Sequence, residues 1–134
     1  MIKLVVSDVD GTLIKPGETR ISEKTLSLLG ELKEKGVLFA VASGRDYDAI
    51  RPLFGKIKND IIYITNNGGV VMYQGKVLCK TPIDKMLSVT IMNEMQKKRD
   101  CRVLLAGETG SYVSTYDTDF TRYLAEHGIF PQKM

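Results

Sequence analysis

The chain has 134 residues, 43% of them hydrophobic, which is enough for a domain of ordinary size with a buried core. The formal net charge is +3, and the basic residues are scattered among apolar and acidic ones, which argues against a nucleic-acid-binding groove. No run approaches the roughly 18 apolar residues of a membrane span, and the N-terminus lacks the features of a signal peptide. Cys79 and Cys101 show no metal-binding spacing. We therefore expect a cytoplasmic protein that binds neither nucleic acid nor a membrane.

The first predicted strand is the apolar run of residues 2–6, which ends in the polar sequence Ser-Asp-Val-Asp-Gly-Thr at residues 7–12. A helix is predicted next, over residues 22–35, with Ser22 as its N-cap and Gly36 as its stop signal. The face of this helix that packs on the core is predicted from the helical spacing of Thr25, Leu28, Leu29 and Leu32.

Two further apolar runs, residues 37–42 and 61–64, lack the alternation of a half-exposed strand and indicate strands buried on both faces, as in parallel sheets. Residues 46–54 between them predict a short helix that Pro52 kinks or restarts. A right-handed crossover makes the first two strands parallel, so the polar residues that follow each of them meet at one edge of the sheet. The pattern predicts a doubly wound, Rossmann-like α/β fold.

The pattern changes after residue 69. Residues 70–73 and 76–80 flank Gln74-Gly75, a two-residue link typical of a tight hairpin. The remaining predicted elements are a helix over residues 83–99, strands over residues 102–106 and 112–116, and a helix over residues 118–127. We place a boundary near residues 81–82, so that residues 1–81 form a parallel α/β core and residues 82–134 belong to an α+β unit.

Two carboxylates, Asp8 and Asp10, follow the first strand directly. Residues i and i+2 of a strand point to the same side, and two carboxylates held close together repel unless a cation or a shared proton lies between them. An oxygen-rich Mg²⁺ site with a carboxylate nucleophile fits this pattern. The structural alternative is a pair of aspartates that cap turns or a helix.

Two other polar groups follow the second and third strands. Ser43-Gly44-Arg45 supplies a hydroxyl, a flexible backbone N–H and a guanidinium, all of which suit a phosphate. Its alternative role is to cap the helix that follows. Asn66-Asn67-Gly68-Gly69 predicts a turn, either alone or with an added contact to substrate. His127, the only histidine, is expected on the surface without a role.

Asp8-Val9-Asp10-Gly11-Thr12 matches the DxDGT motif of the haloacid dehalogenase (HAD) superfamily, and Ser43-Gly44-Arg45 resembles its second motif. The sequence Ile-Thr-Asn-Asn-Gly-Gly at residues 64–69, followed by a hairpin, resembles the Cof-type, sugar-phosphatase-like branch, in which a cap is inserted after the third strand. By resemblance the chain is the N-terminal portion of a HAD phosphatase, with residues 82–134 as part of an α+β cap.

The resemblance implies Mg²⁺-dependent hydrolysis of a phosphoric monoester of a small metabolite, with sugar phosphates as the expected class. Asp8 would attack phosphorus and form an aspartyl-phosphate, and Asp10 would act first as an acid and then as a base. Asp8 and Asp10 would also hold the Mg²⁺. The residues implied to hold the phosphate are Gly11, Thr12, Ser43 and Gly44, and those implied to contact the substrate are Arg45 and Asn67.

The third and fourth motifs of the family, a lysine and an acidic segment, are not found before the sequence stops inside the expected cap, and Asp117 and Asp119 do not fit the fourth. We therefore expect a fragment, a truncated gene product or one part of an assembly. The first alternative function is a catalytically impaired or inactive form of such an enzyme.

The second alternative is a phospho-acceptor receiver domain. That class needs an aspartate at the end of the third strand, where this chain has Thr65-Asn66-Asn67. The first strand of a partial core would have an open edge beside an uncovered apolar face. From this we expect a homo-oligomer, a swapped dimer or low solubility.

Overall fold

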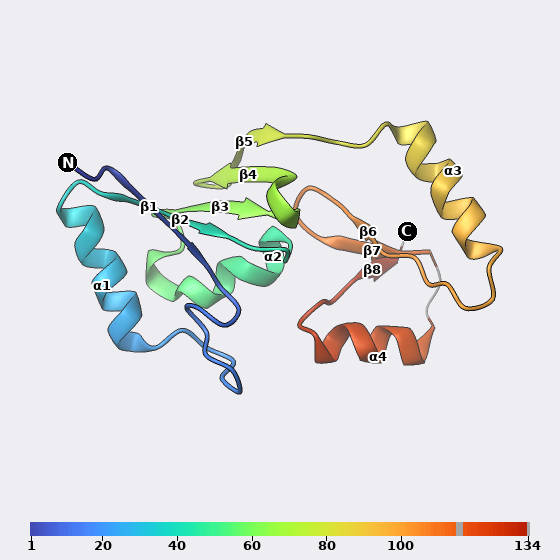
Figure 1. The fold of residues 1–134 in the computed structure, drawn as a ribbon, viewed down its shortest axis with the longest axis horizontal. Coiled ribbons are helices and arrows are strands. Elements are labelled where there is room, and N and C mark those ends of the chain that lie inside the picture. The colour runs from blue at the N-terminus through green and yellow to red at the C-terminus, as the bar shows by residue number, and fades with distance from the viewer. Residues whose placement is uncertain (115–116, 134) are drawn as a thin grey trace. The chain divides into compact units, whose positions relative to one another are not determined.

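The computed structural model describes residues 1–114 and 117–133. The chain divides into a first unit, Met1–Lys80, and a second unit, Thr81–Met134. Figure 1 shows the elements of both units. None of the helices formed by the described residues is long and apolar enough to cross a membrane.

The first unit contains a five-stranded sheet in the order β1-β2-β3-β4-β5. Its strands are β1 (Leu4–Asp8), β2 (Leu38–Ala42), β3 (Ile61–Thr65), β4 (Val70–Tyr73) and β5 (Lys76–Lys80). The first three run parallel, and β4 and β5 add an antiparallel hairpin. Gln74 and Gly75 both adopt positive φ, 51° and 74°, as the predicted tight turn requires. The α/β class predicted from the sequence is confirmed.

The helical connections of this unit are α1 (Glu23–Glu34), α2 (Tyr47–Ile50) and the 3₁₀ segment η1 (Arg51–Ile57), and a short 3₁₀ turn, η2 (Asn66–Gly68), follows β3. The N-cap of α1 is Ser22, as predicted, since its Oγ accepts a hydrogen bond from the Thr25 N–H at 3.1 Å. Pro52 stands in the first positions of η1, where the α-helical geometry of α2 ends. Proline has no N–H to continue an α-helix, so the predicted break falls where expected.

The core of the first unit lies on one face of the sheet. Val41 of β2 and Tyr63 of β3 are almost fully buried there, and they share one hydrophobic cluster with Leu29 of α1, Ile50 of α2 and Phe54 of η1. The strand residues alternate between the two faces, so all three helical segments cover the same face of the sheet. The core is therefore one layer of helices against one face of the sheet.

The buried face of α1 differs from the prediction at one position. Leu26, Leu29 and Leu32 contact the cluster, whereas Leu28 is about half exposed. The residues at 26, 29 and 32 also follow helical spacing, so the sequence pattern fits two neighbouring faces of the helix. Contact with the sheet decides between them.

The opposite face of the sheet carries apolar side chains that no helix of the first unit covers. Leu4 and Val6 of β1 are 48% and 52% exposed, and Leu38 of β2 is 48% exposed. Among the described strands, β1 pairs with β2 alone, so its other edge presents unpaired backbone groups. The predicted open edge and uncovered apolar face are both present in this unit.

The second unit contains a three-stranded sheet in the order β6-β7-β8, with β7 antiparallel to β6 and parallel to β8. Its elements are α3 (Lys85–Gln96), β6 (Leu105–Ala106), β7 (Ser111–Val113), α4 (Thr118–Glu126) and β8 (Gln132–Lys133). The strand predicted at residues 102–106 is shorter than expected, and β8 was not predicted. The strand predicted at residues 112–116 extends onto residues 115 and 116, which lie outside the described residues. Val113 and Leu124 are the buried hydrophobic residues among the described residues of this unit, while α3 buries no residue fully.

Candidate active site

The chain turns immediately after β1, around the fully buried Val9. The carbonyl of Val9 accepts hydrogen bonds from the N–H groups of Thr12, Leu13 and Ile14 at 3.2, 2.9 and 2.9 Å. Gly11 takes a φ of 85° within this turn, and its N–H donates to the Ile14 carbonyl at 2.8 Å. The N–H groups of Gly11 and Thr12 thus already donate hydrogen bonds within the turn. Of these two residues, the exposed Thr12 has a side-chain hydroxyl that can bind a ligand.

Asp8 and Asp10 are exposed on either side of Val9. β1 ends at Asp8, so Asp10 belongs to the turn and not to the strand on which the spacing argument relied. The two carboxylates differ in their partners. Among the described residues, none donates a hydrogen bond to the Asp8 carboxylate. Arg45, in contrast, donates to both carboxylate oxygens of Asp10, with Nε 3.0 Å from Oδ2 and Nη2 2.6 Å from Oδ1.

The loop after β2 begins with Ser43, which is nearly buried. In the parallel register Asp8 lies opposite Ala42, the residue before Ser43, so the ends of β1 and β2 meet as predicted. The Ser43 hydroxyl accepts the Arg45 N–H at 3.1 Å, and its own hydrogen stays available to donate. The N-cap of α2 is Asp46, whose Oδ1 accepts the Ala49 N–H at 2.9 Å. The capping role considered for Ser43-Gly44-Arg45 is therefore wrong.

The loop after β3 packs directly onto the loop after β2. The N–H groups of Asn66 and Asn67 donate to the carbonyls of Arg45 and Ser43 at 3.1 and 3.2 Å. Both asparagines have positive φ, 52° and 55°, a backbone region in which asparagine is enriched. A Cβ on Gly44 would lie 2.9 Å from Asn67 Oδ1, so any larger residue at this position would displace the Asn67 side chain.

The three loops at the carboxyl ends of the parallel strands thus bring together residues that are far apart in the sequence. The predicted site residues joined by direct contacts are Asp10, Ser43, Gly44, Arg45 and Asn67. Ligands of open α/β sheets bind at this edge. β3 ends in the fully buried Thr65, so the third strand offers no acceptor aspartate of the receiver type.

The side-chain and main-chain atoms at this edge that could bind a metal are oxygen atoms, which Mg²⁺ prefers as ligands. Within residues 1–114 and 117–133 there is no group of three or more His, Cys, Asp or Glu side chains that could hold a metal ion. Mg²⁺ is commonly held by one or two carboxylates, with water and phosphate oxygens in the remaining positions. The Asp8 carboxylate, which accepts no hydrogen bond from a described residue, fits a site of that kind.

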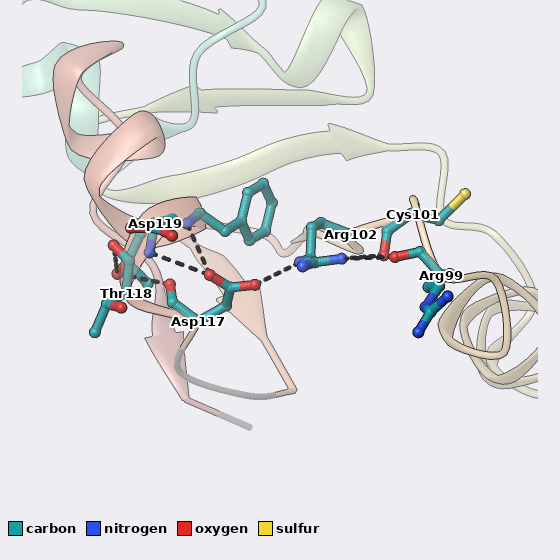
Figure 2. A network of polar contacts seen from close by, with 8 residues as sticks. Arg99, Cys101, Arg102, Asp117, Thr118 and Asp119 are labelled. Carbon is teal, nitrogen blue, oxygen red and sulfur yellow. Dashed lines mark hydrogen bonds and ion pairs between the residues drawn. The ribbon is translucent and has the colours of Figure 1, made fainter.

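A separate polar network in the second unit accounts for Asp117 (Figure 2). Its Oδ1 accepts the N–H groups of Asp119 and Phe120 at 3.1 Å each, which makes it the N-cap of α4, and its Oδ2 accepts the Arg102 Nε–H at 2.5 Å. These contacts, the Phe120 N–H first and Arg102 next, hold the pKa of the Asp117 carboxyl below its usual value. Asp117 therefore supports the helix, in keeping with its poor fit to the fourth motif.

The model of the haloacid dehalogenase-like hydrolase family matches residues 5–133. The chain belongs to this family, as its motifs indicated. A related sequence is the 5-amino-6-(5-phospho-D-ribitylamino)uracil phosphatase of Escherichia coli K12, 27% identical over 125 residues, which are 93% of this chain and 46% of that protein. Another is the HMP-PP phosphatase of Enterobacter sp. strain 638, 35% identical over 85 residues, which are 63% of this chain and 31% of that protein.

Solved structures agree with this assignment. A crystal structure from Eubacterium rectale superposes with a TM-score of 0.81 at 27% identity, over 99% of this chain and 51% of that one. The HAD subclass IIB sugar phosphatase BT4131 superposes with a TM-score of 0.73 at 24% identity, over 98% of this chain and 52% of that one, which shows a shared fold. The chain spans about half the length of these structures and less than half of the two curated relatives.

Proposed function

We propose that this chain carries the nucleophile-bearing part of the active site of a Mg²⁺-dependent phosphoric monoester hydrolase. The observation that carries the proposal is the contrast between two neighbouring carboxylates at the end of β1. Asp8 is exposed and its carboxylate has no hydrogen-bond partner among the described residues, whereas the Asp10 carboxylate is fixed by two hydrogen bonds from Arg45. Two carboxylates in different environments suit two different roles.

In the proposed reaction a carboxylate oxygen of Asp8 attacks phosphorus, and the bond from phosphorus to the alkoxide of the substrate breaks. The leaving alkoxide takes a proton from Asp10, so Asp10 is then a carboxylate. Water attacks the phosphorus of the aspartyl-phosphate and gives a proton back to Asp10. The bond from phosphorus to the Asp8 oxygen breaks, and inorganic phosphate leaves.

The phosphoryl oxygens would be held by the Ser43 and Thr12 hydroxyls and the Gly44 N–H, while Gly11 shapes the turn. Asp8 and the main-chain carbonyl of Asp10 would hold Mg²⁺. When bound, the ion neutralises part of the charge that builds up between the nucleophile and the phosphate. Mg²⁺ dependence rests on the oxygen donors at this edge and on the resemblance of the motifs.

The substrate class proposed is a small phosphorylated metabolite, with sugar phosphates as the first group to test. Support comes from relatives named as phosphatases of a phosphoribityl compound and of HMP-PP, and from a fold shared with a sugar phosphatase. A cytoplasmic location belongs to the same proposal, because Cys79 and Cys101 are both free thiols.

The test is hydrolysis of p-nitrophenyl phosphate by the wild type and by Asp8→Asn, with Mg²⁺ and with EDTA. Asp100→Asn, an exposed aspartate of the second unit, is the matched control. We expect Mg²⁺-dependent release of phosphate that Asp8→Asn reduces to the level of the blank and Asp100→Asn leaves unchanged. Equal rates for the wild type and Asp8→Asn would overturn the proposal for this chain.

A second candidate function is a site that binds phosphate without turnover, and the nearly buried Ser43 hydroxyl, whose hydrogen stays available to donate, favours it. Calorimetry with inorganic phosphate and Mg²⁺ separates the two candidates. Binding without turnover supports the second candidate, and turnover above the Asp8→Asn blank rejects it.

We also propose that the first unit associates with a second copy through β1 and the uncovered face beside it. Exposed Leu4, Val6 and Leu38 and the unpaired edge of β1 support this proposal. Light scattering should give a mass that rises with concentration, and Val6→Lys should lower it. Leu78→Lys is the matched control, because Leu78 is 60% exposed on β5, at the other edge of the sheet. A monomer mass independent of concentration would contradict the proposal.

A further inference from the structure

Arg45 connects all three loops of the candidate site. Its N–H donates to the Ser43 Oγ at 3.1 Å, and its carbonyl accepts the Asn66 N–H at 3.1 Å. The backbone of Arg45 is thus fixed by the loops that follow β2 and β3. Its guanidinium reaches a residue 35 positions earlier in the chain, the aspartate in the turn after β1.

The contact with Asp10 has the geometry of a fork. Nε and Nη2 each donate to a different carboxylate oxygen, at 3.0 and 2.6 Å, and the two side chains are 28% and 54% exposed. A planar guanidinium that engages both oxygens fixes the orientation of the carboxyl group as well as its position. At this exposure the pair adds little to stability, so its main effect is on where the Asp10 carboxyl group points.

The sequence pattern suggested that Arg45 contacts the substrate. The structure shows its fork engaged by Asp10, so the same N–H groups reach a phosphate only if the pair breaks. We propose that Arg45 is a positioning residue, which holds the Asp10 carboxyl group where it transfers protons to and from the reacting oxygens. This inference rests on the proposed function of Asp10.

The proposal predicts a dependence on the leaving group. p-Nitrophenolate leaves without much help from an acid, whereas an alkoxide needs a proton as it leaves. The ratio kcat/KM reports the steps up to departure of the leaving group and omits the later hydrolysis of the aspartyl-phosphate. Loss of Arg45 should therefore lower kcat/KM much more for an alkyl phosphate than for an aryl phosphate.

The experiment compares the full chain with Arg45→Met and Arg45→Lys on p-nitrophenyl phosphate and glucose 6-phosphate. Lys56→Met, which removes an exposed cation of η1, is the matched control. We expect kcat/KM to fall by about 100-fold on the alkyl ester and by less than about threefold on the aryl ester in both Arg45 variants. Lysine cannot form the fork, so it should not restore the rate. An equal loss on both esters, or rescue by Arg45→Lys, would overturn the proposal.

A stability cycle gives a readout that needs no turnover. Asp10→Asn, Arg45→Met and the double variant are compared with the wild type by urea unfolding. If Arg45 holds Asp10, the effect of the double variant on the unfolding constant should differ from the product of the two single-variant effects by a factor of about 2 to 5. Multiplicative effects would show that the pair does not form in solution and would overturn the inference. An inactive wild type with a coupled pair would count against the proposed function and not against the contact.

Discussion

The buried hydroxyl of Tyr63 offers a sharp test of how the core supports the candidate site. Tyr63 lies on β3, the strand that leads into the loop of Asn66 and Asn67, and its hydroxyl donates to the Lys58 carbonyl at 2.7 Å. Its ring makes edge contacts with Tyr47 and Phe54, with centroids 5.2 and 5.7 Å apart. Tyr63→Phe removes the hydroxyl and keeps the ring.

We expect Tyr63→Phe to lower the free energy of unfolding by about 1 kcal/mol, the net value of one hydrogen bond between uncharged groups. The contact is only partly buried, so we expect this net value and not the larger cost of a fully buried acceptor left unpaired. For a unit of 80 residues such a loss lowers the melting temperature by about 4–8 °C.

The assay is urea unfolding followed by far-ultraviolet circular dichroism, with the change read from the midpoint at constant slope. Tyr73→Phe is the matched control, because Tyr73 is a half-buried tyrosine of β4 with no hydrogen bond from its hydroxyl to any described residue. It should change stability by less than about 0.5 kcal/mol. Equal midpoints for Tyr63→Phe and Tyr73→Phe would refute the assignment of stability to the Tyr63 hydroxyl.

The same variant tests the effect of alkaline pH. Burial raises the pKa of Tyr63 above its ordinary value of 10.0. Above about pH 10 the unfolded chain releases this proton while the folded chain keeps it, so wild-type stability falls as the pH rises. Tyr63→Phe should lack this part of the decline. A parallel decline in the two proteins would show that Tyr63 is not protected from ionisation.

Two further substitutions give expected outcomes of other kinds. Gly44→Ala should change the unfolding free energy by less than about 1 kcal/mol, because reduced freedom of the unfolded chain offsets the displacement of the Asn67 amide. It should nevertheless lower hydrolysis of p-nitrophenyl phosphate, and an unchanged rate would show that Asn67 need not approach the Ser43 loop so closely. Asp117→Asn should reduce hydrogen-exchange protection of the α4 amides at neutral pH. The lowered pKa of Asp117 contributes stability above its ordinary value of 3.8, so the gap between the variant and the wild type should shrink below about pH 4, and a constant gap would contradict this account.

The elements that the sequence predicted well depend on signals within a few residues. α1 begins after Ser22 because one hydroxyl satisfies a free N–H of the first turn. The hairpin forms at Gln74-Gly75, where both residues adopt positive φ and the glycine does so without strain. The parallel order of the first strands followed from their apolar runs and the handedness of crossovers. Such signals also carried the motifs, and with them membership in the haloacid dehalogenase-like family.

Short strands without a local signal were harder to predict. β8, Gln132–Lys133, has only two residues and forms because it pairs with β7. A strand this short has no alternation of apolar and polar residues from which it could be predicted. Likewise, the spacing on α1 fits a face with Leu28 and a face with Leu26, and only contact with the sheet shows that Leu26 is the one packed on the core. In both cases the deciding interaction joins segments that are distant in the sequence.

The sequence by itself determined that two carboxylates, a serine loop and an asparagine turn would meet at one edge of a parallel sheet. Only the tertiary structure decided which of these side chains form hydrogen bonds with one another. The guanidinium of Arg45 could have faced a phosphate or a carboxylate, and its position two residues after Ser43 allows both. The turn around the buried Val9 brings Asp10 to that guanidinium and leaves the Asp8 carboxylate without a hydrogen-bond partner among the described residues. Two residues 35 positions apart meet only through folding, so no local sequence pattern could predict this division of roles.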